Sequence, residues 1–217
     1  MNFIFEQMRT GGDRNFGYVL GDRSAGSGVL VDPSFDPETL IERAEAQGLE
    51  VQMIINTHGH ADHTNGNARA KELTGAPLAA YRTAASAPDV PLKDGDTLEP
   101  GSLKLRFLHV PGHADDHLLI HIAEYGVAIT GDLLFVGKIG GTSGEAAARE
   151  EYESLERALR ELPDATTVWP GHDFGCRPAS TIGLEKATNP FLLCEDFDEF
   201  LELKRTWSSF KAEHGLA

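Results

Sequence analysis

The order of hydrophobic patterns along the chain predicts an α/β sandwich, in which two β-sheets pack together and helices cover their outer faces. Short apolar runs typical of strands come first, helical patterns are interleaved with the later strands, and helices finish the chain. The sequence contains no internal repeat, low-complexity tract or long linker. We therefore expect one domain over residues 1–217, with a short helical extension from about residue 178 to residue 217.

Turn-forming residues divide the N-terminal part into short strands and two helices. Gly21-Asp22 and Gly26-Ser27 separate two β-like runs, and Pro37 precedes a helical pattern that Gly48 ends. We expect strands at residues 3–5, 16–20, 28–31 and 51–55, and helices at residues 38–47 and 67–73.

The remainder contains short apolar runs bounded by Gly, Pro or Asp, and longer helical patterns. Leu155, Leu159 and Leu162 recur at helical spacing in one of these patterns. We expect strands at residues 76–80, 103–110, 118–122, 127–130 and 166–169, and helices at residues 146–161, 178–187 and 195–213.

The composition narrows the range of partners and cofactors. The 34 acidic and 19 basic residues give a net charge of −15, which would repel a polyanion such as nucleic acid. No apolar run approaches the ~20 residues of a membrane-spanning helix, and the N-terminus lacks the pattern of a signal peptide. We therefore expect a cytoplasmic location and no membrane partner. Cys176 and Cys194 form no disulfide framework, so any metal must be held mainly by His and carboxylate groups.

Residues 57–63, Thr-His-Gly-His-Ala-Asp-His, hold four potential metal ligands directly after a predicted strand. In extended backbone, side chains at i and i+2 point the same way, so we expect His58 and His60 to bind one ion. Asp62 and His63 are expected to point apart from each other and to serve a second ion beside it. Zinc accepts imidazole nitrogen and carboxylate oxygen at ~2.0–2.2 Å, which makes this segment the strongest local indication of a metal site.

Three further residues of ligand type follow predicted strands. His113 follows a Pro-Gly pair, Asp132 follows a glycine, and His172 follows a second Pro-Gly pair. A glycine at such a position allows the backbone to turn tightly where the strand ends. If the strands share one sheet edge, seven candidates converge there: His58, His60, Asp62, His63, His113, Asp132 and His172.

In this order, the motifs resemble those of the metallo-β-lactamase fold superfamily: His-x-His-x-Asp-His, then Pro-Gly-His, Gly-Asp and Gly-His. Within it the chain is similar to the branch of glyoxalase II (hydroxyacylglutathione hydrolase) and persulfide dioxygenase. Residues 131–135 (Gly-Asp-Leu-Leu-Phe) and 188–192 (Thr-Asn-Pro-Phe-Leu) add to this resemblance. It covers nearly the whole chain and implies an αββα sandwich of two mixed β-sheets flanked by helices.

Carried over motif by motif, the resemblance implies two divalent metal ions. It puts three histidines on the first ion, two histidines and a carboxylate on the second, and one carboxylate between them. The first set is His58, His60 and His113; the second is Asp62, His63 and His172; the bridge is Asp132. Zinc is the expected metal, and iron and manganese accept the same ligand types.

Such a site implies a metal-dependent hydrolase. A metal lowers the pKa of bound water from 15.7 to about 7, and the hydroxide can attack a carbonyl carbon while the metals stabilise the oxyanion. We expect Asp62 and Asp132 to be the catalytic residues beside a bridging hydroxide. A thiol with a pKa of about 8.5 leaves as thiolate, whereas an amide nitrogen needs a proton donor. These points favour a small-molecule thioester and a thioesterase of glyoxalase II type.

Two other activities on the same fold remain open: a mononuclear iron persulfide dioxygenase and a lactonase-like hydrolase. The sequence does not determine the acyl group, the native metal or the oligomeric state. Glyoxalase II enzymes hold glutathione with a Lys and a Tyr after the Gly-Asp ligand, and a gap-free alignment puts Gly141 and Ser143 there. We therefore expect S-lactoylglutathione to be hydrolysed but bound poorly, unless Lys138, Lys204 or Arg205 replaces the missing groups.

Three residues near the ligands are candidates for supporting roles. Asp32 follows a predicted strand and is expected to support the site from behind the ligands. His117 matches the last His of the Pro-x-His-x-x-x-His segment of glyoxalase II and is a candidate to support a ligand. Cys176 lies four residues after His172, near enough in sequence to approach the metals, but we favour a plain free thiol.

Overall fold

The computed structural model describes residues 2–214 and contains two six-stranded mixed β-sheets. The first sheet, in spatial order, consists of β1 (Phe3–Gly11), β2 (Asn15–Asp22), β3 (Ser27–Val31), β4 (Glu50–Ile55), β5 (Leu78–Tyr81) and β6 (Val90–Leu92). The second consists of β12 (Ser180–Thr181), β11 (Thr167–Pro170), β10 (Val127–Gly131), β9 (Leu118–Ile122), β8 (Leu105–His109) and β7 (Thr97–Leu98).

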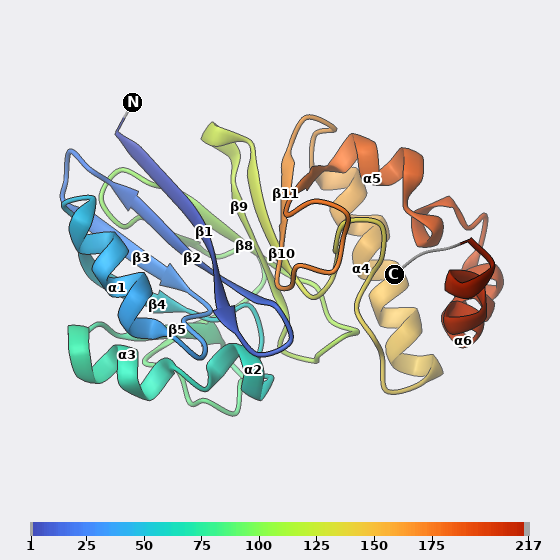
Figure 1. The fold of residues 1–217 in the computed structure, drawn as a ribbon, viewed down its shortest axis with the longest axis horizontal. Helices are drawn as coiled ribbons and strands as arrows, with labels where there is room; N and C mark the ends of the chain where they lie inside the picture. The colour runs from blue at the N-terminus through green and yellow to red at the C-terminus, as the bar shows by residue number, and fades with distance from the viewer. Residues whose placement is uncertain (1, 215–217) are drawn as a thin grey trace.

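Helices cover the outer face of each sheet (Figure 1). The first sheet is covered by α1 (Pro37–Ala46) and α3 (Asn67–Thr74), and the short α2 (Ala61–Thr64) lies in the loop after β4. On the side of the second sheet lie α4 (Glu145–Glu161), α5 (Ile182–Thr188) and α6 (Phe197–His214). Two 3-10 turns, η1 (Ala123–Tyr125) and η2 (Pro190–Leu193), complete the described elements. The predicted αββα sandwich is confirmed.

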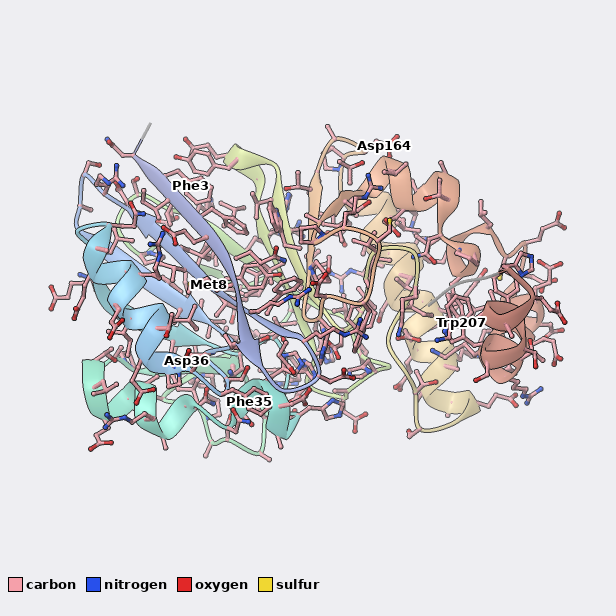
Figure 2. The ribbon with its side chains drawn as sticks, viewed as in Figure 1. Phe3, Met8, Phe35, Asp36, Asp164 and Trp207 are labelled. Atoms are coloured by element: carbon pink, nitrogen blue, oxygen red, sulfur yellow. The ribbon has the colours of Figure 1, made fainter. Side chains whose placement is uncertain are left out.

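Apolar side chains form three layers of core, and Figure 2 shows the side chains on the ribbon, with Trp207 on α6. The layer between the two sheets includes Tyr18, Phe107 and Ile129, all fully buried. A second layer joins the second sheet to α4 and α6, where Trp207 packs 4.7 Å from Phe191 between ring centroids. A third joins the first sheet to α1 and α3. Burial from both faces explains why the central strands read as continuous apolar runs rather than alternating ones.

The strand directions bring several loops to one edge of the sandwich. Strands β3, β4 and β5 are parallel neighbours, and β10 and β11 are parallel neighbours in the other sheet. Parallel strands end on the same edge, so the loops after them open together. The backbone N–H of Phe16, at the start of β2, donates to Gly171 O after β11 at 2.8 Å and ties the two sheets together there.

Local sequence explains where the helices begin. Asp36 caps α1 by accepting a hydrogen bond from the Thr39 N–H at 3.1 Å, and Pro37 occupies the first helical position. Thr181 caps α5 by accepting from the Leu184 N–H at 3.2 Å. The helix predicted at residues 178–187 is therefore wrong in its first part, because residues 180–181 pair with β11 as an edge strand.

Several short strands had no clear sequence signal. The edge strands β6, β7 and β12 contain only two or three residues each, too few to show a period. Strand β1 extends to Gly11, well beyond the predicted residues 3–5, because it pairs with β2 along its whole length. None of the described helices is both long and apolar enough to cross a membrane. The division into one domain with a helical extension stays a prediction.

Candidate metal centre

Three imidazoles converge in the first group of potential metal ligands. His58 Nε2 lies 3.0 Å from His60 Nδ1, and His113 Nε2 lies 2.9 Å from the same atom. All three ligand atoms lie within 4.8 Å of one another. His58 is buried and His60 is exposed, so one side of this group opens toward solvent.

A second group lies beside the first and contains Asp62, His63 and His172. His63 Nε2 is 3.2 Å from His172 Nε2, and Asp62 Oδ2 is 3.4 Å from His172 Nε2. The two histidines are buried, whereas the Asp62 side chain is 41% exposed.

The carboxylate of Asp132 lies between the two groups. Its Oδ2 is 3.4 Å from His113 Nε2 and 3.3 Å from His172 Nε2, so one oxygen reaches a member of each. Its Oδ1 is buried and has no hydrogen-bond partner among the described residues. Burial alone would raise the pKa of Asp132, but His172, His63 and His113 bring it down to about 2. The carboxylate is therefore ionised at neutral pH.

The atoms that face the centre fit metal coordination better than hydrogen bonding. Imidazole nitrogens point at each other at 2.9–3.2 Å, although a neutral imidazole can supply only one donor. Two nitrogens bound at ~2.0–2.1 Å to one tetrahedral zinc lie about 3.3 Å apart. Together with the unpartnered Asp132 Oδ1, this spacing fits divalent ions held between the side chains.

A separate partner holds the far ring nitrogen of each of three histidines. The carbonyl oxygen of Gly141 lies 2.8 Å from His113 Nδ1, and that of Asp13 lies 2.9 Å from His172 Nδ1. Thr57 Oγ1 lies 3.0 Å from His58 Nδ1. A carbonyl can only accept, so it fixes the proton on Nδ1 and leaves the lone pair of Nε2 directed at the centre.

Asp32 supports the site from behind His63, as predicted. Its Oδ2 lies 2.9 Å from His63 Nδ1 and accepts a hydrogen bond from the Thr57 hydroxyl at 2.6 Å, while Oδ1 accepts from the Thr57 N–H at 2.8 Å. Its φ of +48° lies in the left-handed region, which Asp tolerates better than most residues. Burial alone would lower the pKa of His63, but Asp32, with Asp132 and Asp62, raises it to about 9.

The backbone of the His-x-His-x-Asp-His block is not extended throughout. His60 is extended and caps α2, but Asp62 and His63 lie in this helical turn. Their ligand atoms are 3.8 Å apart, so the expectation that they point apart is wrong. The turn brings both side chains to one group, which an extended segment would not do for neighbouring residues.

Two supporting residues carried no sequence signal. Asn15, at the start of β2, donates to Asp62 Oδ2 at 3.0 Å and lies 3.4 Å from His172 Nε2. Asp116 accepts a hydrogen bond from the Gly59 N–H at 3.2 Å and so holds the segment between His58 and His60. Both act across long sequence separations, which no local pattern reports.

The structure also places His117 and Cys176. His117 is fully buried, and its Nε2 accepts a hydrogen bond from the backbone N–H of Asp132 at 3.0 Å. His117, a candidate for a supporting role, thus contacts the backbone of Asp132 directly after the left-handed Gly131. Cys176 is a free exposed thiol and belongs to none of the potential ligand groups found among residues 2–214.

The layered fold and the convergent His and Asp groups define a metalloenzyme with an αββα sandwich. Residues 10–172 match the Metallo-beta-lactamase superfamily, and the chain belongs to this superfamily.

Three similar proteins lie on two functional branches. The hydroxyacylglutathione hydrolase of Gloeobacter violaceus is 36% identical over 218 residues, covering 83% of this chain and 85% of that protein. The human mitochondrial persulfide dioxygenase ETHE1 is 30% identical over 187 residues, covering 84% of this chain and 74% of that protein. The crystal structure of ETHE1 from Myxococcus xanthus has a TM-score of 0.87 and 30% identity, covering 94% of this chain and 91% of that one.

Removing Asp132 should disturb both ligand groups. We expect the wild-type protein to bind two equivalents of metal at saturation. Asp132→Ala should weaken the binding of both metal ions. Because a direct ligand is lost, the affinity should fall by more than the roughly 100-fold that loss of an outer partner can cost. The matched variant Asp62→Ala should weaken the binding of only one metal ion. Equilibrium dialysis with elemental analysis measures both, circular dichroism controls for folding, and a saturating stoichiometry of one in the wild type would contradict the expectation.

Metal affinity should rise with pH up to about 9. His63 is protonated in the metal-free protein below its pKa of about 9, and a bound imidazole must be neutral, so binding releases its proton. The apparent affinity of the second group should rise by about tenfold per pH unit below pH 9 and level off above it. Competition with a chromogenic chelator measures this, and Asp32→Asn should lower the pH at which the rise ends. Equal affinity at pH 7 and pH 8.5 would refute the expectation.

Proposed function

We propose that this protein is a metal-dependent hydrolase of small-molecule thioesters, of glyoxalase II type, that holds two divalent ions, with zinc as the expected metal. The observation that carries the proposal is the pair of complete three-ligand groups with Asp132 between them. One tetrahedral ion needs about four ligands, and seven converge here. The proposal includes neither a nucleic acid nor a membrane partner.

The residues of the site have distinct proposed roles. When bound, two divalent ions supply a water molecule of lowered pKa and a Lewis acid for the substrate carbonyl oxygen. Asp132, ionised and buried, fixes the spacing of the two groups. Asp62 is partly exposed and its Oδ2 is oriented by Asn15, so it can accept a hydrogen bond from the attacking water. The thiolate of a thioester leaves without a proton donor, whereas an amide nitrogen needs one, which favours a thioester substrate.

Persulfide dioxygenase is the second candidate. The similarity to ETHE1 from Myxococcus xanthus, over nearly the whole of both chains, favours it. This activity would use one iron ion and would leave part of the ligand set without a metal. The number of ligands favours the hydrolase, the structural similarity to ETHE1 favours the dioxygenase, and the relatives in sequence include both.

Parallel assays of two metal forms separate the candidates. We expect the zinc form to hydrolyse S-lactoylglutathione with a turnover within the usual enzyme range of about 1–10³ s⁻¹, and the iron form to consume no oxygen with glutathione persulfide. Short lactones form a third arm, and Asp132→Ala is the inactive control. Rapid oxygen uptake by the iron form, with no thioester hydrolysis by either form, would replace the proposal with the second candidate.

Two of the three side chains that could replace the missing glutathione-binding groups already form ion pairs. Lys204 forms an ion pair with the buried Glu151, and Arg205 pairs with Glu145 at 3.1 Å. Lys138 Nζ instead lies 4.2 Å from the ring centroid of Phe174. Of these three residues, Lys138 is therefore the one that we propose replaces the Lys and Tyr absent at residues 141 and 143.

Glutathione should contribute little to substrate binding. Each charged hydrogen bond to a carboxylate contributes ~1.5–3 kcal/mol, so a site that offers few of them loses affinity but keeps its chemistry. We expect S-lactoylglutathione to exceed the N-acetylcysteamine thioester of the same acid by less than about tenfold in kcat/KM. Steady-state kinetics of both esters measures this. A micromolar KM for the glutathione ester that Lys138→Met leaves unchanged would reveal recognition by other residues.

A further inference from the structure

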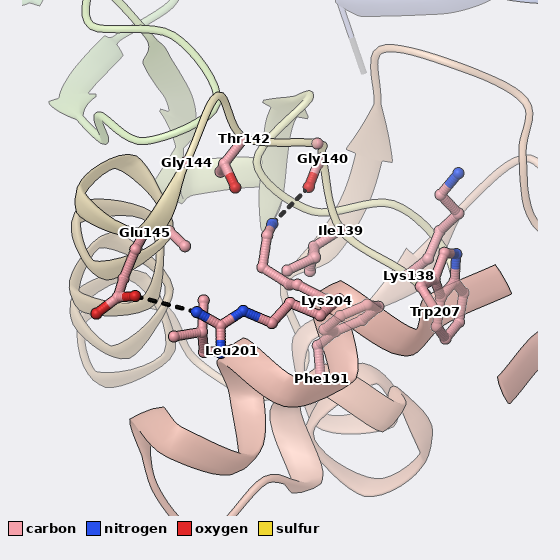
Figure 3. Close-up of a pocket in the computed structure, with 13 residues that line it drawn as sticks. Lys138, Ile139, Gly140, Thr142, Gly144, Glu145, Phe191, Leu201, Lys204 and Trp207 are labelled. Carbon is pink, nitrogen blue, oxygen red and sulfur yellow. Dashed lines mark hydrogen bonds and ion pairs between the residues drawn. The ribbon is translucent and has the colours of Figure 1, made fainter. Parts of the chain in front are cut away.

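The C-terminal helix α6 reaches into the region behind the first ligand group. Lys204 of α6 forms an ion pair with Glu151 of α4, and the exposed fractions of the two side chains are 11% and 0%. Lys204 Nζ also donates a hydrogen bond to the carbonyl oxygen of Gly140 at 2.9 Å (Figure 3). Lys204 therefore joins two helices to the loop that precedes α4.

The loop that precedes α4 contacts the side chain of His113. Gly141, next to Gly140, presents its carbonyl oxygen 2.8 Å from His113 Nδ1. Gly140 is closely packed on the side of the site, since a Cβ there would overlap Asp132 O and approach the imidazole of His113. A continuous series of contacts thus runs from Glu151 through Lys204 and the loop to the imidazole.

Helix α4 supports His113 from a second side. Gly112 has a φ of +135°, and a Cβ there would overlap the backbone of Glu151. Ser154, one turn further along α4, donates its hydroxyl to Pro111 O at 2.7 Å. The turn that carries His113 therefore rests on the same part of α4 that anchors Lys204.

We expect the buried ion pair of Glu151 and Lys204 to contribute little to the stability of the fold. Glu151 Oε1 has no hydrogen-bond partner among the described residues. Burial raises the pKa of Glu151, although the ammonium of Lys204 opposes the rise. Apolar side chains often replace such buried pairs without loss of stability, so the pair needs another explanation.

We propose that Lys204, held in place by Glu151, is a positioning residue for His113: it fixes the carbonyl of Gly141 through Gly140 and so directs His113 Nε2 into the first ligand group. The inference rests on the proposed metal binding but not on the proposed thioesterase activity. It concerns a helix outside residues 10–172, the part of the chain that matches the superfamily.

The test measures zinc binding to metal-free protein by competition with a chromogenic chelator. Lys204→Met should weaken one binding step by roughly 10–100-fold, the usual effect of losing a partner that orients a ligand. His113→Ala identifies which step belongs to the first group, and Lys204→Met should leave the other step unchanged. Lys204→Arg, which keeps a donor toward Gly140, should restore most of the affinity.

The double variant Glu151→Met/Lys204→Met separates positioning from stability. It buries no charge, so its midpoint of chemical unfolding should equal or exceed that of the wild type, while the weakened zinc step stays weak. Arg205→Met, which removes the neighbouring cation of α6, is the matched control and should bind zinc as the wild type does.

Three results would overturn the inference. Wild-type affinity in Lys204→Met would show that His113 needs no such support. Recovery of affinity in the double variant would show that the pair acts through stability alone. A wild-type protein that binds no zinc, iron or manganese would refute the metal assignment and this inference together, whereas missing thioesterase activity with normal zinc binding would leave the inference standing.

Discussion

The metal centre depends on one buried carboxylate placed where two groups of imidazoles meet. Asp132 is 5% exposed, and removing its charge from water is costly unless positive groups surround it. In the described chain the pKa values of His63 and His172 are raised, so their imidazoles, 3.5 and 3.3 Å from its oxygens, are the positive partners. Burial lowers the pKa of His113, which lies 3.4 Å away as a neutral imidazole. The carboxylate therefore favours imidazolium or metal ions around it, and the convergent histidines favour ions that share it. The buried carboxylate and the facing imidazoles therefore depend on each other.

The layered fold supplies the orientation that such a centre requires. Strand ends deliver the ligands, but the groups that fix their rings come from elsewhere: the turn after β1, the loop after β3 and the loop before α4. These segments meet because parallel strands of both sheets end on the same edge. Two of the orienting atoms are backbone carbonyls, which accept only and so determine the tautomer of the ring they hold. The geometry of the centre thus depends on how the two sheets are joined.

The difference between ligands at strand ends and orienting groups from distant loops explains what the sequence could predict. The ligand candidates were recognisable because each follows an apolar strand, and a strand end is a local feature. The helical turn at Asp62 and His63 was not, since the short block has no helical period of its own. The supporting groups were harder still: Asn15 lies 47 residues from Asp62, and Asp13 and Gly141 act through backbone atoms that every residue possesses. The edge strands of two or three residues were not predicted either, because their pairing is set by a neighbouring strand.

Helix α6 connects the metal centre with the surface beside it. Together with the segment before α4, it lines a pocket of about 400 Å³ whose walls include Phe191, Leu201 and Trp207. Lys204 lines the same pocket and donates a hydrogen bond to Gly140 O, next to the Gly141 carbonyl that contacts His113. A change of packing in this pocket therefore acts on the loop that orients an imidazole, without touching a ligand. The ligand groups are built by strand ends within the superfamily match, whereas this control over one of them comes from the C-terminal helix.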